Sequence, residues 1–283
     1  MENNKANMKL WEGFGPTDKK FTKEANVDGN KITSIPGMYM FQKATEAFGP
    51  WGIGWGVDVK EERYDTGGPV LMADSAGKVA MVVTNNGPML EQHHVIKIEL
   101  WYNHEGQRGT VTAYGSTKSL YSTNAGKIKS DGEAPKKSYT DAVKKALSHI
   151  GICSDIFLGL FDDQNYVAQS QAELSIKQAV ESEESVEILI SALIEKADKT
   201  VKTMETASTA SELNGLFKSI FRDLDSNSKA LHAKGQTEPA EKLNRVVKRI
   251  AAVVGKRKSE LEAAKGRNKK GDDKATETQG ASE

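Results

Sequence analysis

The pattern of apolar residues changes near Val167, and this change limits the folds that the chain can adopt. Before Val167, apolar residues alternate with polar ones in short runs, which is typical of half-buried strands. After it, apolar residues recur at helical spacing, which is typical of amphipathic helices. Strands that are grouped together and followed by helices indicate an α+β protein rather than an alternating α/β protein. The sequence therefore predicts an antiparallel β-meander packed by helices, followed by a small C-terminal helical module.

The first part of the chain contains the elements of this meander. A helix is predicted over residues 36–48, where apolar side chains share one side and Gly49 and Pro50 stop the helix. Alternating apolar residues and turn signals predict the strands, which are expected over 54–64, 70–87 (a hairpin), 93–103 and 109–121. A basic loop then leads to the helix that closes the meander.

The closing helix is expected within residues 139–163, which combine an amphipathic segment with a short apolar turn and two aspartates. Lys144 and Lys145 lie next to its apolar stripe, so a packed helix must expose part of its cationic surface. Thr140 is expected to be the N-cap, and Gly151 is expected to end the helix. A helix of this kind suits contact with a polyanion.

The second part of the chain is predicted to be helical over residues 185–204, 210–226 and 240–265, with Ser211 as a helix cap. The last two of these helices are expected to pack together as an antiparallel module. The polar residues that follow are predicted to be disordered. The whole chain is thus divided into a flexible N-terminal arm (1–32), a core (33–167), an acidic linker (168–187), a helical module (188–265) and a disordered tail (266–283).

The composition excludes several classes of protein. The single cysteine, Cys153, rules out an intramolecular disulfide framework and a cysteine-rich zinc site, and its apolar neighbours predict a buried thiol. The N-terminus lacks the apolar core of a signal peptide. No apolar run approaches the roughly 18 residues that a membrane span requires. We therefore expect a soluble intracellular protein.

Charge is segregated along the chain, although its 39 basic and 39 acidic side chains give a net charge of zero. Acidic residues dominate between Asp162 and Glu187, and basic residues dominate between Lys242 and Lys270. A smaller basic run lies between residues 118 and 145. Because local potential governs contact with phosphates, a neutral chain of this kind can still bind nucleic acid.

The motifs that would indicate nucleotide or metal chemistry are incomplete. The glycines at 52, 54 and 56 lack the Gly-x-Gly-x-x-Gly spacing and precede a strand, where that motif requires a helix. There is no Gly-Lys-Ser/Thr phosphate loop, which argues against an ATP-dependent recombinase or helicase, and no cofactor is predicted. Asp162 and Asp163 invite a nuclease metal site, but no second acidic cluster supports it. The alternative is that they end a helical turn.

Two separated motifs give this sequence a resemblance to a known family. The first motif is GPWGIGW, from Gly49 to Trp55. The second motif consists of Thr140, Asp141, Ala142, Lys144, Lys145, Ala146, Leu147, Gly151, Asp155, Gly159, Phe161, Asp162 and Asp163. In this order and spacing the two motifs resemble those of the phage single-strand annealing proteins of the Rad52-like group, over roughly the first 170 residues.

The resemblance implies an ATP-independent protein that binds and anneals single-stranded DNA during phage recombination and DNA repair, in the cytoplasm of a bacterial host. It also implies a homo-oligomer, either a ring or a helical filament, which holds the DNA backbone in a groove and leaves the bases exposed. The implied partners are single-stranded DNA, the annealed duplex intermediate, and a single-strand binding protein or an exonuclease at the C-terminal helices. For these basic helices, DNA contact and a simply solvated surface remain open alternatives.

The candidate DNA-binding residues are cations for phosphate contact and aromatic side chains for base stacking. Tyr114 lies among the lysines, whereas Trp51 and Trp55 fit either base stacking or the core. The candidate cations are Lys118, Lys127, Lys129, Lys136, Lys137, Lys144 and Lys145. Two other classes of protein stay open, a metal-dependent nuclease and a structural or scaffolding protein whose oligomers form without DNA.

Overall fold

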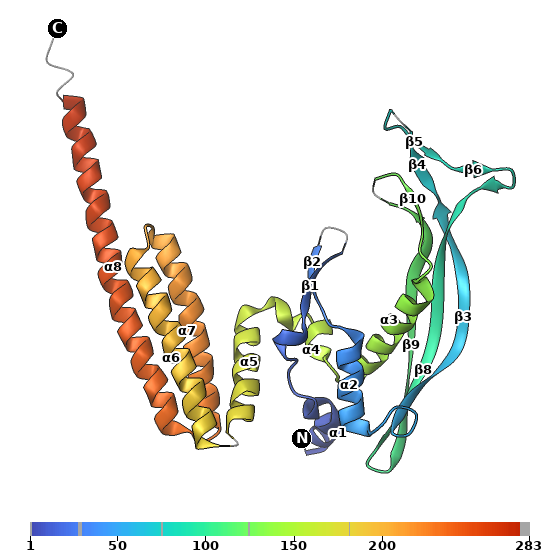
Figure 1. The fold of residues 1–283 in the computed structure, drawn as a ribbon, viewed down its shortest axis with the longest axis horizontal. Helices are drawn as coiled ribbons and strands as arrows, with labels where there is room; N and C mark the ends of the chain where they lie inside the picture. Colours follow the sequence, from blue (N-terminus) through green and yellow to red (C-terminus); the bar gives the residue numbers. More distant parts are fainter. Residues whose placement is uncertain (1, 28–29, 75, 124, 181, 278–283) are drawn as a thin grey trace, which may run out of the picture. The chain divides into compact units, whose positions relative to one another are not determined.

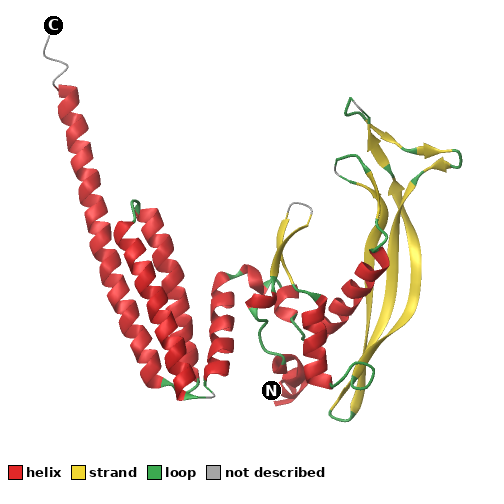
Figure 2. Cartoon of the chain, viewed as in Figure 1, coloured by secondary structure: helices red, strands yellow, loops and turns green. Residues whose placement is uncertain are grey.

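The computed structural model describes residues 2–27, 30–74, 76–123, 125–180 and 182–277. The chain forms two compact units, Met1–Asp162 and Asp163–Glu283. The first unit contains the sheet, and the second is helical, as Figure 2 shows by colour. The predicted α+β class, with a C-terminal helical module, is confirmed.

A four-stranded antiparallel sheet forms the centre of the first unit (Figure 1). Its strands lie in the order β10, β9, β8 and β3, so that neighbours in the sequence are neighbours in the sheet. A turn at Glu105 and Gly106, both with positive φ, joins the two central strands. The bounds of the strands are β3 Trp55–Pro69, β8 Leu90–His104, β9 Gln107–Ser122 and β10 Ile128–Ser130. The predicted meander is confirmed.

Helices α2 (Gly37–Phe48) and α3 (Ala134–His149) lie on one face of this sheet (Figure 1). Close packing of α3 on β9 requires Gly115, because a Cβ atom there would lie 1.9 Å from the carbonyl oxygen of Ser138. The core between the sheet and the two helices includes Met40, Ala44, Trp55, Ile98, Leu100, Ala113, Ala142, Ala146 and Leu147.

Helix α3 begins earlier than the sequence predicts. Its N-cap is Glu133, and Pro135 lies in its first turn, where the missing N–H needs no partner. The expected cap Thr140 lies inside the helix, and its hydroxyl donates to the carbonyl oxygen of Lys136 at 2.9 Å. The expected end is closer to the observed one, since α3 ends at His149 and Gly151 follows with a φ of 105°.

Regular elements and contacts with the core occur within residues 2–27 and 30–32, in the segment that the sequence predicts to be a flexible arm. Phe14 packs edge-on against Phe48, with ring centroids 6.0 Å apart. The backbone N–H and the hydroxyl of Thr17 donate to the buried carboxylate of Asp155 at 2.8 and 2.5 Å. The elements in this region are α1 Glu2–Gly13, η1 Lys19–Phe21, β1 Lys23–Val27 and β2 Asn30–Ser34.

Two small hairpins are inserted between β3 and β8, where the sequence predicts one. The pair β4–β5 matches the predicted hairpin, and a turn at Asn85 and Asn86 joins the pair β6–β7. Their bounds are β4 Leu71–Ala73, β5 Val79–Met81, β6 Val83–Thr84 and β7 Gly87–Pro88.

Two short helical segments end the first unit, α4 (Ser154–Phe157) and η2 (Leu160–Asp162). Cys153 precedes α4 with a φ of 53° and is buried, as its apolar neighbours predict. Burial raises the pKa of its thiol to about 11. Because the thiolate form is disfavoured, the chemistry of Cys153 is that of a small apolar side chain.

The second unit consists of four helices, among the residues described. Their bounds are α5 Gln164–Ala179, α6 Glu183–Thr206, α7 Ala210–Ala233 and α8 Thr237–Glu277. Most of the predicted linker 168–187 is therefore helical, because Ala172, Ile176 and Ala179 bury an apolar stripe in the core of this unit. The cap of α7 is Thr209 rather than Ser211. Helix α8 includes residues 266–277 of the predicted disordered tail, and residues 278–283 lie outside the described residues.

Candidate nucleic-acid interface

The face of the sheet opposite α3 is uncovered by other described elements of the first unit (Figure 1). Because side chains alternate along a strand, the pairing register decides which of them share this face. On β8, buried residues such as Ile96 and Ile98 face the helices, so Lys97 and Trp101 face outward. The outward aromatic and cationic side chains, which we call the sheet surface, are Lys97, Trp101, Arg108, Tyr114, Lys118, Tyr121 and Lys129.

Arg108 and Trp101 form the first cation–aromatic pair of the sheet surface. The guanidinium carbon of Arg108 lies 4.3 Å from the centre of the indole ring. The indole extends across Gly56 of β3, where a Cβ atom would lie 2.7 Å from it. The glycine in the GPWGIGWG segment thus allows Trp101 to lie across the neighbouring strand. Arginine planes stacked in this way are used for contact with unpaired bases.

Lys97 and Tyr114 form the second pair. They are direct partners in the register of β8 and β9, and the ammonium of Lys97 lies 5.5 Å from the ring centre of Tyr114. The side chain of Tyr114 is 47% exposed. Tyr114, a stacking candidate from the sequence, therefore presents its ring to solvent beside a cation.

Tyr121 has two lysines beside its ring. Lys118 and Lys129 lie 5.8 and 5.9 Å from its centre. Lys129 reaches this position because β10 pairs it directly with Tyr121. Lys118 also contacts Glu91 at 3.3 Å. Two of the candidate lysines thus converge on one aromatic side chain.

Acidic side chains also lie on this face, and most of them are engaged. Glu99 contacts Lys60 at 3.0 Å, and Glu61 and Asp65 both contact Arg63. Asp58 has no ion pair among the described residues. Among the described residues, Lys97, Arg108 and Lys129 also form no ion pair, so their positive charges are available to a polyanion.

The lysines of α3 are mostly paired with acids. Lys136 contacts Glu133 at 2.8 Å, and Lys145 contacts Asp141 at 2.8 Å. Lys137 contacts Asp131 at 2.5 Å, and this hydrogen bond raises the pKa of Lys137 above its usual value. Exposed pairs of this kind are weak, so phosphates can compete with the acids.

Lys144 differs from the other lysines of α3 because it is half-buried. It lines a hollow of about 340 Å³ together with Ile32, Phe157 and Phe161. Burial lowers the pKa of Lys144, and the nearby Asp141 opposes this shift. Among the described residues Lys144 has no ion pair, so an anion that enters the hollow would meet a poorly solvated cation.

The remaining sequence candidates lie elsewhere. Lys127 is exposed in the turn before β10. Trp51 is 46% exposed and packs edge-on against Trp55, with ring centroids 4.5 Å apart. Trp55 is fully buried, and its indole N–H donates to the hydroxyl of Thr45 at 3.2 Å. The prediction that Trp55 stacks on a base is therefore wrong. Trp55 is a core residue, which was the alternative that the sequence left open.

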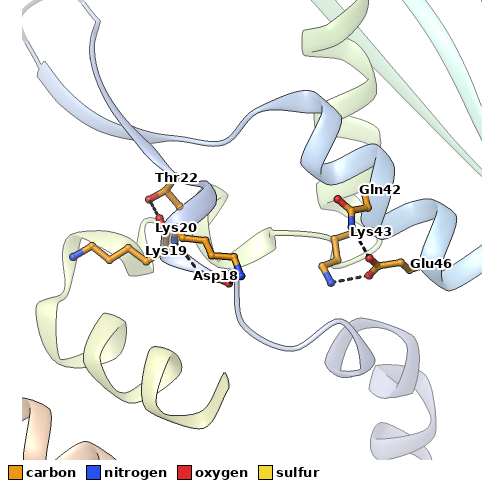
Figure 3. Close-up of polar contacts among 7 residues, drawn as sticks. All are labelled: Asp18, Lys19, Lys20, Thr22, Gln42, Lys43 and Glu46. Carbon is orange, nitrogen blue, oxygen red and sulfur yellow. Dashed lines mark hydrogen bonds and ion pairs between the residues drawn. The ribbon is translucent and has the colours of Figure 1, made fainter. Parts of the chain in front are cut away.

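A further basic cluster near α2 was missed by the sequence analysis. Phe21 stacks on Tyr39 with ring centroids 4.2 Å apart, and the ammonium groups of Lys20 and Lys43 lie 4.9 and 5.7 Å from these two rings. Figure 3 shows Lys43 reaching Glu46, which it contacts at 2.7 Å. This cluster is hard to predict from the sequence, because its residues lie in two separate segments that only the fold brings together.

Lys97, Trp101 and Arg108 were also missed, although strand alternation predicts that they lie opposite the core residues. Asp163, a candidate for a nuclease site, caps α5 by accepting from the N–H of Asn165 at 2.7 Å. In the part of the chain that the structure describes, no three His, Cys, Asp or Glu side chains form a group that could hold a metal ion. No helix of that part is long and apolar enough to cross a membrane.

Comparisons with known proteins add no family to this picture. No protein-family model matches the sequence. Neither the search of curated proteins nor the search of solved structures returns a significant match.

Proposed function

We propose that this protein binds and anneals single-stranded DNA without ATP, as an oligomer that holds the strand by its backbone in phage recombination and DNA repair. The observation that carries the proposal is the sheet surface. There, Lys97, Arg108 and Lys129 each lie beside an aromatic ring and have no ion pair among the described residues. Cations beside exposed rings are the pattern that binds single strands without reading their sequence.

Annealing has a physical requirement that this arrangement meets. A protein that contacts phosphates and the faces of bases leaves the Watson–Crick edges free to find a complement. Stacking of a base on an aromatic side chain contributes about 1–3 kcal/mol and tolerates every base. Rings at Trp101, Tyr114 and Tyr121 supply such platforms, with cations next to each of them.

The α3 lysines and the C-terminal helices have supporting roles in this proposal. Lys144 and its neighbours would add phosphate contacts on the other side of the sheet. The basic surface of α8 would bind DNA, a single-strand binding protein or an exonuclease. The setting that the sequence resemblance implies is the cytoplasm of a bacterial host.

An annealing assay tests the proposal directly. Two complementary oligonucleotides, one with a fluorophore and one with a quencher, are mixed with the purified chain in buffer without nucleotide or magnesium. We expect the protein to accelerate duplex formation and to bind each single strand with an affinity that falls as salt rises. A variant with Trp101→Ala and Tyr121→Ala should lose most of both activities, whereas Lys229→Ala, on α7, should retain them.

The same experiment separates the alternative functions. Cleavage of the oligonucleotides after addition of magnesium would support a nuclease. Oligomers without salt-dependent affinity for single strands would support a scaffolding protein. Either result, in the absence of annealing, would overturn the proposal.

A further inference from the structure

Helix α6 carries an acidic stripe on its solvent-exposed side. Glu184, Glu187 and Glu195 are all exposed, and Ser191 lies between them. Glu195 also forms an exposed ion pair at 2.7 Å with Lys199 of the same helix, which a second copy would have to displace or share. Together with Ile188, which is 64% exposed, they line an open hollow of about 390 Å³. Ile188 leaves apolar area in water between these carboxylates, and a contact that covered it would be favourable.

Helix α8 carries a basic stripe with the same geometry. Arg245, Lys248 and Lys256 are exposed and have no ion pair among the described residues, and Ala252 lies between them. Residues 184, 187, 191 and 195 of the acidic stripe have the same spacing along the helix as residues 245, 248, 252 and 256 of the basic stripe. At 1.5 Å per residue each stripe is about 16 Å long, and equivalent residues project in equivalent directions.

Within one copy of the chain, the two stripes do not meet. Helices α6 and α8 pack together through other residues, among them the ion pair between Asp198 and Arg249 and the buried side chains Ile190 and Leu243. Both stripes remain exposed on the surface of the second unit. Each copy therefore offers one acidic and one basic stripe to its surroundings.

We propose that the acidic stripe of one copy docks against the basic stripe of α8 in a second copy. Parallel packing of the two helices brings three opposite charges together at once, pairing Glu184 with Arg245, Glu187 with Lys248 and Glu195 with Lys256. Ser191 and Ala252, the small residues at the equivalent third position, let the helices approach closely. This contact covers Ile188.

A second copy suits this surface because its basic stripe is opposite in charge to the acidic stripe and is exposed in every copy. The contact is heterologous, since each copy uses a different stripe toward each neighbour. Contacts of this type build rings when they close and filaments when they do not. The inference goes beyond the proposed function, because it requires no DNA and gives the basic stripe of α8 to a second copy in place of the DNA or partner contact of that function.

Charge reversal in the full chain tests the contact. One variant carries Glu184→Lys, Glu187→Lys and Glu195→Lys, and the other carries Arg245→Glu, Lys248→Glu and Lys256→Glu. Each variant alone has two stripes of the same sign, so we expect weaker self-association in sedimentation velocity at low salt. A mixture of the two should regain association, because each can dock on the other. Circular dichroism and thermal unfolding establish that both variants are folded.

Disulfide cross-linking tests the register independently of association elsewhere in the chain. Two differently tagged chains, one with Glu187→Cys and one with Lys248→Cys, are mixed and oxidised. We expect a tagged heterodimer in higher yield than from the control pair Glu187→Cys and Lys229→Cys, because Lys229 is exposed on α7 outside the basic stripe. High salt should lower the yield toward that of the control.

Three results would overturn the inference. The cross-link yields could be equal for the two pairs, or both reversal variants could sediment like the native chain. Alternatively, the variant of the basic stripe could lose affinity for an oligonucleotide while self-association is unchanged, which would assign the basic stripe to nucleic acid instead.

Discussion

The guanidinium of Arg108 lies over the indole of Trp101 at 4.3 Å, across the two central strands of the sheet. Seven positions separate the two residues in the sequence, and the turn at Glu105 and Gly106 folds them back onto each other. The indole extends across Gly56 on the third strand. Three strands thus cooperate to place one cation–aromatic pair on the open face of the sheet.

Removing the unpaired cations of the sheet surface should lower the salt dependence of DNA binding. For the variant Lys97→Ala, Arg108→Ala and Lys129→Ala, we expect the slope of log K against log salt to fall by about 2, since each phosphate contact on a single strand contributes about 0.7. Fluorescence anisotropy with an oligonucleotide over a range of salt concentrations measures the slope.

The matched control removes the same amount of charge from the helical unit, with Lys199→Ala, Lys229→Ala and Lys242→Ala. Each of these lysines forms an ion pair within its own helix. An equal loss of slope in the control would show that net charge, and not the sheet surface, governs binding.

Replacing Tyr114 by alanine should weaken single-strand binding by about 1–3 kcal/mol, or about 5- to 150-fold, because a stacking platform is lost. Tyr114→Phe should bind like the native chain, since the ring is retained. Tyr64→Ala is a control on an exposed tyrosine that packs against His94 on the other side of the sheet. Anisotropy titrations at one salt concentration measure all three. Equal affinities for Tyr114→Ala and the native chain would contradict a stacking role.

The substitution Gly115→Ala should destabilise the first unit strongly. The added methyl group would lie 1.9 Å from the carbonyl oxygen of Ser138 and 2.8 Å from the amide nitrogen of Ala142, and backbone atoms cannot move aside as a side chain does. We expect the free energy of unfolding to fall by about 1–3 kcal/mol or more, since this is the usual cost of overpacking a core. Thermal or denaturant unfolding measures it. Gly68→Ala is the control, since no atom lies within 4 Å of a Cβ atom there. Similar stability of both variants would mean that α3 does not pack closely on β9.

Lys144→Met should stabilise the fold and weaken single-strand binding. Burial lowers the pKa of Lys144 below the usual 10.5, so the charged form is disfavoured in the folded state. Between the lowered and the usual pKa the unfolded chain binds more protons, so native stability should rise with pH in this window. Lys144→Met should lack this rise, so the difference in stability between this variant and the native chain should be largest at neutral pH. Thermal midpoints at pH 7 and near pH 10 measure the effect.

Lys145→Met is the control for this prediction, because Lys145 is exposed and paired with Asp141. It should leave the thermal midpoint nearly unchanged at both pH values. A lower midpoint for Lys144→Met than for the native chain at pH 7 would show that the lysine is stabilised by a contact that outweighs its burial.

Local patterns account for the parts of the fold that were predicted. Apolar residues such as Ile96, Ile98 and Leu100 alternate along β8, and this period is visible without any knowledge of neighbours. The start of α3 was missed because Thr140 is a good cap in isolation, whereas the actual start depends on the turn around Asp131 and on Pro135. Caps compete locally, and tertiary context decides between them.

The sequence by itself determined the strands of the central sheet, the helices α2, α6, α7 and α8, and the order of the two units, because hydrophobic periodicity is a local property. It also placed Tyr114, Lys118 and Lys129 among the candidates. Only the tertiary structure decided that Trp55 belongs to the core and that Trp101, which is half-buried, pairs with the exposed Arg108. Such pairs depend on the register between strands, and register is set by contacts between residues far apart in the chain.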